Sequence, residues 1–253
     1  MIEKQTLTKK VIHICIVAII IIVLIFIAMM IVLKYDEDGE INMPFFISKI
    51  SIISTVDGQD VENSTQKWEK IINQNNDIYL YVEKNNEYKK TETISSIILN
   101  NFKTEKNNNI GEIKFYKQSE NEKLLYENKN EYIFNQLEFK GTKYTNSKKQ
   151  EISNQGGIIE FRCAQNKIGT FSSNEGDEIN YNELLKKINI KEEDLTATIS
   201  FDIILKLDSG KVFKAENIKF NIPNSNIIEQ GKVGTEIDEI NKIVFKRIEN
   251  PKQ

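Results

Sequence analysis

Hydrophobic positions follow two different patterns along the chain. From Val11 to Leu33 they form one continuous run with no formal charge, no proline and no glycine. After residue 45 they alternate with polar positions in short segments, which Asn, Gly, Ser and Lys separate. The first pattern predicts one long apolar helix, and the second predicts β-strands that each bury one face.

The apolar run is long enough to cross a bilayer. An α-helix rises about 1.5 Å per residue, so a helix over Val11–Leu33 covers a hydrocarbon core of ~30 Å with some length left for tilt. A cleaved signal peptide has a shorter core and small residues at its cleavage site, and a buried core helix has a polar stripe. The run Val11–Leu33 has neither a cleavage site of small residues after it nor a polar stripe along it. We therefore predict an uncleaved transmembrane helix.

Charges flank this run unequally. Three lysines precede it. One lysine, Lys34, follows it, and four acidic residues lie between Asp36 and Glu40. Cytoplasmic flanks carry the excess of Lys and Arg, so the N-terminus is expected in the cytoplasm and the C-terminal domain outside the cell membrane. The expected type II, single-pass order is a cytoplasmic tail (1–10), a transmembrane helix (11–33), an acidic stalk (34–44) and an extracytoplasmic domain (45–253).

The alternating segments predict a mostly β fold, an antiparallel β-sandwich with one short helix. Thr196–Leu207 leads through the turn Asp208–Lys211 into Val212–Ile222, as in a hairpin. The short helix is expected at Tyr181–Ile188, capped by Asn180. Further strands are expected at Lys49–Val56, Asp77–Glu83, Thr93–Phe102, Glu112–Lys117, Tyr132–Lys140, Ile158–Cys163 and Lys242–Arg247.

For the remaining segments the pattern allows two structures or predicts loops and turns. The polar stretch 142–156 is either a linker between two sandwiches or a long surface loop of one, and we favour one enlarged sandwich. Residues 63–73 form either a helical turn or a strand. Glu192–Asp194 is expected to begin a loop. The pairs Asn75–Asn76 and Asn85–Asn86 are expected at turns, because Asn tolerates left-handed backbone.

Charge and composition exclude some partners. The formal charge is −3, and residues 1–34 carry four lysines and one glutamate, which leaves −6 for the rest. A domain with this net negative charge is not expected to bind nucleic acid. The abundance of Asn, Lys and Ile is what an AT-rich coding sequence produces.

The sequence lacks common catalytic and cofactor motifs. His13, the only histidine, lies in the apolar run, which excludes imidazole catalysis and His-based metal sites in the outer domain. Phosphate-loop and dinucleotide motifs are missing. Asp36–Glu40 departs from a calcium loop, and Ser64–Lys67 fits S-x-x-K without its companion motifs. We predict no catalytic residue, no cofactor and no metal.

Cys163 has no partner for an intramolecular disulfide, because Cys15 lies in the apolar run. Its alternation with Glu160 and Arg162 places it on the buried face of a strand. An inert buried thiol is expected, with an intermolecular disulfide or a reactive thiol as alternatives.

Two sets of residues are candidate interaction sites. The first is an aromatic patch for a carbohydrate or a protein, for which sheet packing is the alternative explanation. Its members are Tyr79, Tyr81 and Tyr88. The second is a docking segment beside the membrane, with Tyr35, Pro44, Phe45 and Phe46.

The juxtamembrane sequence Tyr35–Ile50 resembles uncharacterised single-pass membrane proteins of low-GC Gram-positive bacteria, as do Gln74–Tyr79 and Gly157–Cys163. This resemblance implies a setting in the cell envelope and no particular activity.

From these features we expect a membrane-anchored extracytoplasmic module that binds, scaffolds or assembles envelope components. Its expected partners are the lipid bilayer, through residues 11–33, and another envelope protein or a cell-wall polymer. One alternative is an envelope glycan hydrolase that uses two carboxylates, for which acidic runs such as Glu192–Asp194 are candidates. The other alternative is an accessory subunit of a membrane complex.

Overall fold

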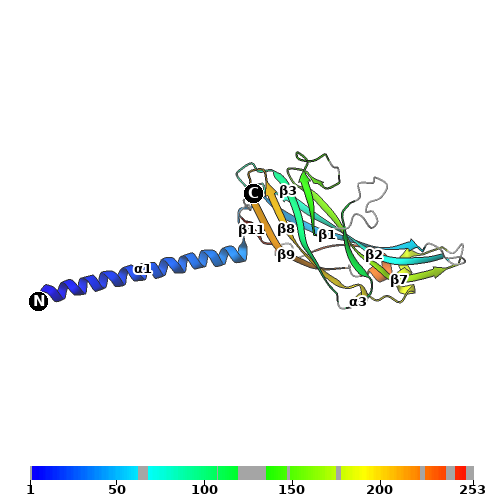
Figure 1. The fold of residues 1–253 in the computed structure, drawn as a ribbon, viewed down its shortest axis with the longest axis horizontal. Coiled ribbons are helices and arrows are strands. Elements are labelled where there is room, and N and C mark those ends of the chain that lie inside the picture. Colours follow the sequence, from blue (N-terminus) through cyan, green and yellow to red (C-terminus); the bar gives the residue numbers. More distant parts are fainter. Residues whose placement is uncertain are drawn as a thin grey trace. The chain divides into compact units, whose positions relative to one another are not determined.

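A computed structural model describes residues 2–61, 68–106, 108–118, 135–146, 149–174, 178–222, 226–237 and 243–248. It divides the chain into two compact units, Met1–Ile41 and Asn42–Gln253. The first unit contains helix α1, Ile2–Asp38 (Figure 1). Within α1, His13–Asp38 is a span of 26 residues with a mean hydropathy of 3.7 in its most apolar window, none of which is buried inside the protein. This helix is long and apolar enough to cross a membrane.

In the second unit, the described residues form β-strands and four short helical segments. The strands are β1 (Phe45–Asp60), β2 (Trp68–Lys84), β3 (Ile94–Lys106), β4 (Glu112–Tyr116), β5 (Gln136–Gly141), β6 (Glu151–Ile152), β7 (Gly157–Ser173), β8 (Ala197–Leu207), β9 (Val212–Ile222), β10 (Lys232–Glu236) and β11 (Phe245–Ile248). The helical segments are the 3₁₀-helix η1 (Tyr181–Glu183), α2 (Leu184–Lys187), α3 (Glu192–Leu195) and α4 (Ile227–Gln230).

The strands form two sheets. Sheet A has the order β10-β1-β2-β7-β4, and sheet B has the order β11-β9-β8-β3-β5-β6. The short β6 is parallel to β5, and the other described pairs are antiparallel. This architecture confirms the predicted mostly β fold.

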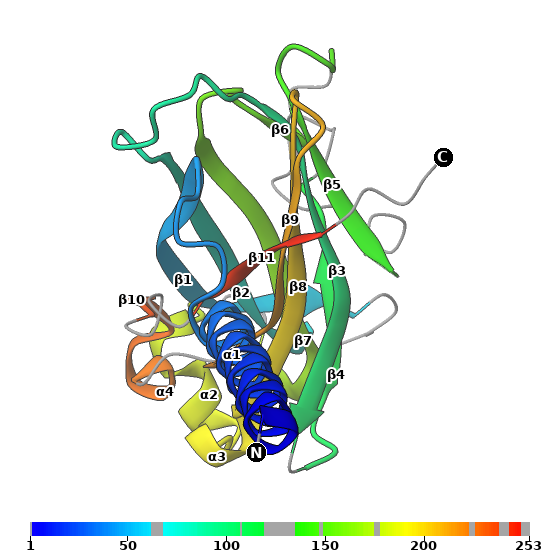
Figure 2. The same cartoon turned by 90° about the vertical axis from the view of Figure 1, so that its left-hand side faces the viewer.

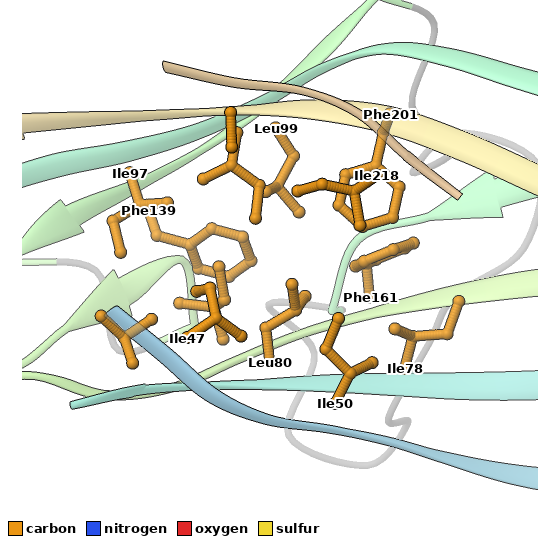
Figure 3. Packing of buried hydrophobic residues seen from close by; sticks show 14 of the residues in the cluster. Ile47, Ile50, Ile78, Leu80, Ile97, Leu99, Phe139, Phe161, Phe201 and Ile218 are labelled. Carbon is orange, nitrogen blue, oxygen red and sulfur yellow. The ribbon is translucent and has the colours of Figure 1, made fainter. Parts of the chain in front are cut away.

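The two sheets pack face to face through their apolar positions (Figure 3). Phe161 of sheet A lies between aromatic rings, with centroids 5.4 Å from Phe201 and 5.6 Å from Phe102. The buried alternation of β8 follows its sequence pattern, since Ile199, Phe201, Ile203 and Leu205 are all at most 3% exposed. Cys163 is a free thiol in this core, where burial raises its pKa.

Sheet A extends beyond this core. Its strands β1, β2 and β7 continue into a second apolar cluster, which the short helices cover (Figure 2). The buried members of this cluster are Val56, Ile72, Ile168, Leu184, Leu185, Leu195 and Ile227. Gly231 ends α4 at φ 63°, and an added Cβ there would come within 2.6 Å of the Tyr181 carbonyl oxygen. Glycine therefore permits both the left-handed turn and the close approach of α4 to η1.

A layer of polar side chains separates the two apolar clusters. Ser54, Gln74, Asn76 and Gln165 are each 0% exposed. Asn76 Oδ1 accepts hydrogen bonds from Ser54 Oγ (2.6 Å) and Gln74 Nε2 (2.5 Å), and its Nδ2 donates to the Cys163 carbonyl (3.1 Å). With its amide in the orientation that satisfies both of its polar atoms, Gln165 donates to the Leu195 carbonyl (3.1 Å) and accepts from Lys106 Nζ (2.8 Å). Because these groups satisfy one another, the layer can be buried without a large desolvation cost.

The strand predictions hold for the segments with clear alternation. The hairpin of β8 and β9 is confirmed, while β7 continues ten residues past the predicted end at Cys163. The short strands β6 and β10 were not predicted, because they contain few apolar residues. Parts of the predicted strands Tyr132–Lys140 and Lys242–Arg247 lie outside the described residues.

Three local predictions need correction. Asn75 and Asn76 lie inside β2 rather than at a turn, because the Ser54 side chain and the Cys163 backbone carbonyl satisfy the Asn76 amide. Glu192–Asp194 belongs to the short helix α3 rather than to a loop, since the Asp194 carboxylate accepts from the Lys191 backbone amide at the start of the helix. The predicted helix Tyr181–Ile188 begins with a 3₁₀ turn, which the Asn180 side chain does cap. Of the ambiguous stretch 63–73, the described residues 68–73 are strand.

We expect Phe161→Ala to lower the free energy of unfolding by about 3–5 kcal/mol, because it removes a fully buried ring from between three others. Denaturant unfolding of the full chain in detergent measures this. Phe46→Ala is the matched control, since Phe46 is 40% exposed and should cost on the order of 1 kcal/mol. Equal losses for the two variants would contradict the packing described.

Candidate functional site

The outward face of sheet A brings together aromatic, apolar and charged side chains of β2 and β7. Cross-strand pairs place Tyr81 opposite Ile158, and Tyr79 opposite Glu160. Both tyrosines are partly exposed, because strand alternation directs Ile78, Leu80 and Val82 into the core.

A shallow groove of about 400 Å³ lies where β2 ends and β7 begins. We call it the β2–β7 groove. Its lining residues are Tyr81, Val82, Glu83, Lys84, Asn86, Gln155, Gly156, Gly157 and Ile158. Ile158 is 51% exposed and supplies an apolar contact, while Lys84 Nζ donates to Gln155 Oε1 (2.9 Å) across the groove.

Gly156 allows the floor of this groove to form. Its φ is 107°, and an added Cβ would lie 2.6 Å from the Val82 carbonyl oxygen. A side chain at this position would therefore be strained and would push the β7 start away from β2.

Polar contacts position Tyr81 and Glu83, which line the groove. Lys49 Nζ lies 5.3 Å from the centroid of the Tyr81 ring, which is a cation–π contact. Ser48 Oγ donates to Glu83 Oε1 at 2.6 Å. These contacts hold one aromatic face and one carboxylate in defined positions before any partner binds.

Farther along the same face, the ionisable groups form pairs. Arg162 donates to Asp77 through Nε (2.6 Å) and Nη2 (3.0 Å), in a bidentate ion pair. Burial raises the pKa of Tyr79, and the neighbouring carboxylates of Glu160 and Asp77 raise it further. Tyr79 therefore stays neutral at physiological pH and acts as a hydrogen-bond donor to Glu160.

The structure brings together only part of the predicted aromatic patch. Tyr79 and Tyr81 share the outward face of β2, whereas Tyr88 lies on the following loop. Lys211 Nζ bonds the Tyr88 hydroxyl at 2.9 Å and lies 5.6 Å from its ring centroid. Tyr88 is thus engaged by the β8–β9 turn.

The predicted docking segment is divided between the two units. Tyr35 belongs to α1 and is 36% exposed. Pro44 is buried and Phe45 is 0% exposed, so their side chains are not accessible to a partner. Phe46 remains accessible, at 40% exposure.

Sequence reasoning missed Ile158 and the glycines before it. In the sequence, Ile158 falls on the same strand face as Glu160 and Arg162. An apolar residue on this polar face is the feature that could have indicated a contact site. That Gly156 and Gly157 line a groove depends on the pairing of β7 with β2, which no local pattern reveals.

A second polar cluster lies on the outward face of sheet B. Burial alone would raise the pKa of Asp202, but hydrogen bonds from the Asn217 backbone amide, the Asn101 side chain and Lys214 outweigh it and lower the pKa. This cluster bridges β3, β8 and β9 at two irregularities in strand register. Within the part of the chain that the structure describes, no group of three or more His, Cys, Asp or Glu side chains is placed to hold a metal ion.

Comparison with protein-family models, with curated proteins and with solved structures found no match to this chain.

We expect Asp202→Asn to reduce the loss of stability at low pH. The folded pKa of Asp202 is lowered, so its stabilising effect is present above the ordinary value of 3.8 and disappears as the pH falls through the folded value. The measurement compares urea unfolding at pH 7 and below pH 3. Lys214→Gln should give a smaller reduction, because two neutral donors to Asp202 remain. An unchanged difference between the two pH values in Asp202→Asn would contradict the assignment.

Proposed function

We propose that this protein is a membrane-tethered binding module of the cell envelope. In this proposal α1 spans the cell membrane with its N-terminus in the cytoplasm, and the sandwich binds another envelope component on the outer side. The observation that supports it best is the exposed apolar helix: a core helix of a soluble protein would bury such a surface, and this helix buries none of its most apolar window in protein. The lysines before the helix support the orientation.

The β2–β7 groove supports binding as the role of the sandwich. It is open and shallow, with an aromatic side chain and an exposed isoleucine beside amide and backbone groups. Such a surface suits an extended polymer or a protein segment better than a small molecule, which needs deeper enclosure. We propose another envelope protein or a cell-wall polymer as the partner.

The groove favours binding over glycan hydrolysis. Hydrolysis at a glycosidic bond ordinarily uses two carboxyl groups about 5–9.5 Å apart. The lining residues of the groove include one carboxylate, Glu83, which accepts a hydrogen bond from Ser48. An accessory subunit of a membrane complex would use the same groove or face. The identity of the captured partner therefore distinguishes this role from the binding of other envelope components.

We expect Ile21→Lys combined with Leu24→Lys to release the protein from membranes. Each lysine near the centre of a transmembrane helix costs about 2.5–3.5 kcal/mol. Alkaline extraction and flotation of membranes measure the bound fraction. Ile41→Lys with Asn42→Lys adds the same charge after α1 and should stay bound. Release of the native chain by the same wash would contradict the proposed anchor.

We expect Tyr81→Ala with Ile158→Ser to lower partner capture by at least about fivefold, because truncation removes the two side chains best placed for contact. Cross-linking in intact cells, followed by mass spectrometry of the recovered protein and glycan, measures capture. Ile71→Ser is the control, since Ile71 lies on the same strand outside the groove. A stoichiometric membrane protein among the products would favour the accessory-subunit role. Undiminished capture would contradict the groove as the binding site.

A further inference from the structure

One end of the sandwich collects loops from four parts of the chain. These are residues 84–93 from the end of β2 to the start of β3, residues 140–146 from the end of β5, residues 149–156 around β6, and residues 206–211 from the end of β8 through the β8–β9 turn (Figure 2). We call them the lysine-rich end. The short helices α2, α3 and α4 lie at the opposite end of the sandwich (Figure 2).

Direct contacts join these loops into one surface. Lys211 Nζ donates to Glu92 Oε1 at 2.6 Å, and the Asp208 backbone amide donates to the Thr93 carbonyl at 3.0 Å. Thr142 Oγ1 donates to Asn154 Oδ1 at 2.9 Å, and Asn154 Nδ2 donates at 2.7 Å to the carbonyl of Ile94, the residue directly after the first of these segments. The surface therefore keeps its shape as a unit.

The lysine-rich end has the opposite charge to the rest of the sandwich. It holds eight lysines and four carboxylates, a net charge of +4. Residues 1–41 hold four lysines and five carboxylates, so the chain total of −3 leaves −2 for the second unit. The sandwich outside the lysine-rich end therefore carries −6. The eight lysines are Lys84, Lys89, Lys90, Lys140, Lys143, Lys149, Lys206 and Lys211.

Part of this charge is accessible. Lys89, Lys90, Lys140 and Lys143 are exposed. Tyr144, beside Lys143, is 48% exposed. Exposed tyrosine together with lysine is typical of surfaces that lie at the headgroup level of a bilayer.

The chain enters the second unit beside the lysine-rich end. Asn85, in the lysine-rich end, bonds the Met43 carbonyl through Nδ2 (2.9 Å) and the Pro44 carbonyl through its backbone amide (2.8 Å). Leu33 is the last residue of the apolar run. The distance from Leu33 to Met43 is at most ~25 Å, because the chain is helical to Asp38 and can at most be fully extended after it. The opposite end lies up to ~55 Å farther along the 17 residues of β7.

We infer that the lysine-rich end binds anionic phospholipid headgroups of the membrane that α1 spans. This inference rests on the proposed transmembrane anchor and goes beyond it, because an anchor alone leaves the sandwich free to tilt. Lipid contact sets the direction of the strands relative to the bilayer. It also keeps the β2–β7 groove close to the surface, since the groove shares Lys84, Asn86, Gln155 and Gly156 with this end. Four carboxylates between Asp36 and Glu40 oppose the attraction, so the lysines must outweigh them.

The test uses the full chain in vesicles of phosphatidylcholine, with or without about 30% phosphatidylglycerol. A fluorophore is attached at Ser209→Cys in a Cys15→Ser background, in which the buried Cys163 does not react. Quenching by neutral acrylamide then reports exposure of the β8–β9 turn. We expect about twofold lower quenching in the anionic vesicles, and loss of this protection in 0.5 M salt. A label at Glu192→Cys, on α3 at the opposite end, should be quenched equally in both vesicles.

Substitutions separate lipid contact from other causes. Changing Lys89, Lys90, Lys140 and Lys143 to Gln should abolish the protection, whereas the same change at Lys187, Lys191, Lys219 and Lys232 should preserve it. A chain that floats with vesicles but shows equal quenching with both lipids overturns this inference alone. Protection that survives the first set of substitutions also overturns it. A chain that does not float overturns the anchor and this inference together.

Discussion

The inward face of sheet A must be covered along its whole length, and the rest of the sandwich depends on this requirement. Strands β1, β2 and β7 have 16, 17 and 17 residues, and their inward positions are apolar at both ends. Sheet B covers one part of this face, and α2, α3 and α4 cover the other. The helices α2, α3 and α4, of four residues each, are stable here because they bury Leu184, Leu185, Leu195 and Ile227 against the sheet, not because of helix propensity.

The polar layer marks the change from one cover to the other. Ser54, Gln74, Asn76 and Gln165 come from three adjacent strands and bond one another in a single register. A slip of one residue in any strand would turn these groups outward and bring polar residues of the outer face into the core. The layer therefore selects the register of sheet A, while the apolar clusters on either side supply most of the burial energy.

The same strands that build the core also present the candidate site. Since side chains alternate across a strand, β2 directs Leu80 inward and Tyr81 outward, and β7 directs Ile159 inward and Ile158 outward. The rigid core thus holds the groove residues in fixed positions. The start of β1 lies beside the end of β2, and the end of β2 lies beside the start of β7. The groove and the lysine-rich end are therefore close to the residues at which the chain enters this domain.

Sequence alone determined the features that depend on local periodicity. The continuous apolar run predicted the long helix, and strict alternation predicted β8, β9 and their turn, because burial of one strand face is written into every second residue. Of the site, alternation placed Tyr79 and Tyr81 outward. Only the tertiary structure decided that Asn75 and Asn76 continue a strand, that Gly156 and Gly157 line a groove and that lysines from four loops share one end. Each of these depends on partners distant in the sequence: a buried amide is stable only when another strand supplies its hydrogen bonds, and a charged surface exists only where the fold gathers its loops.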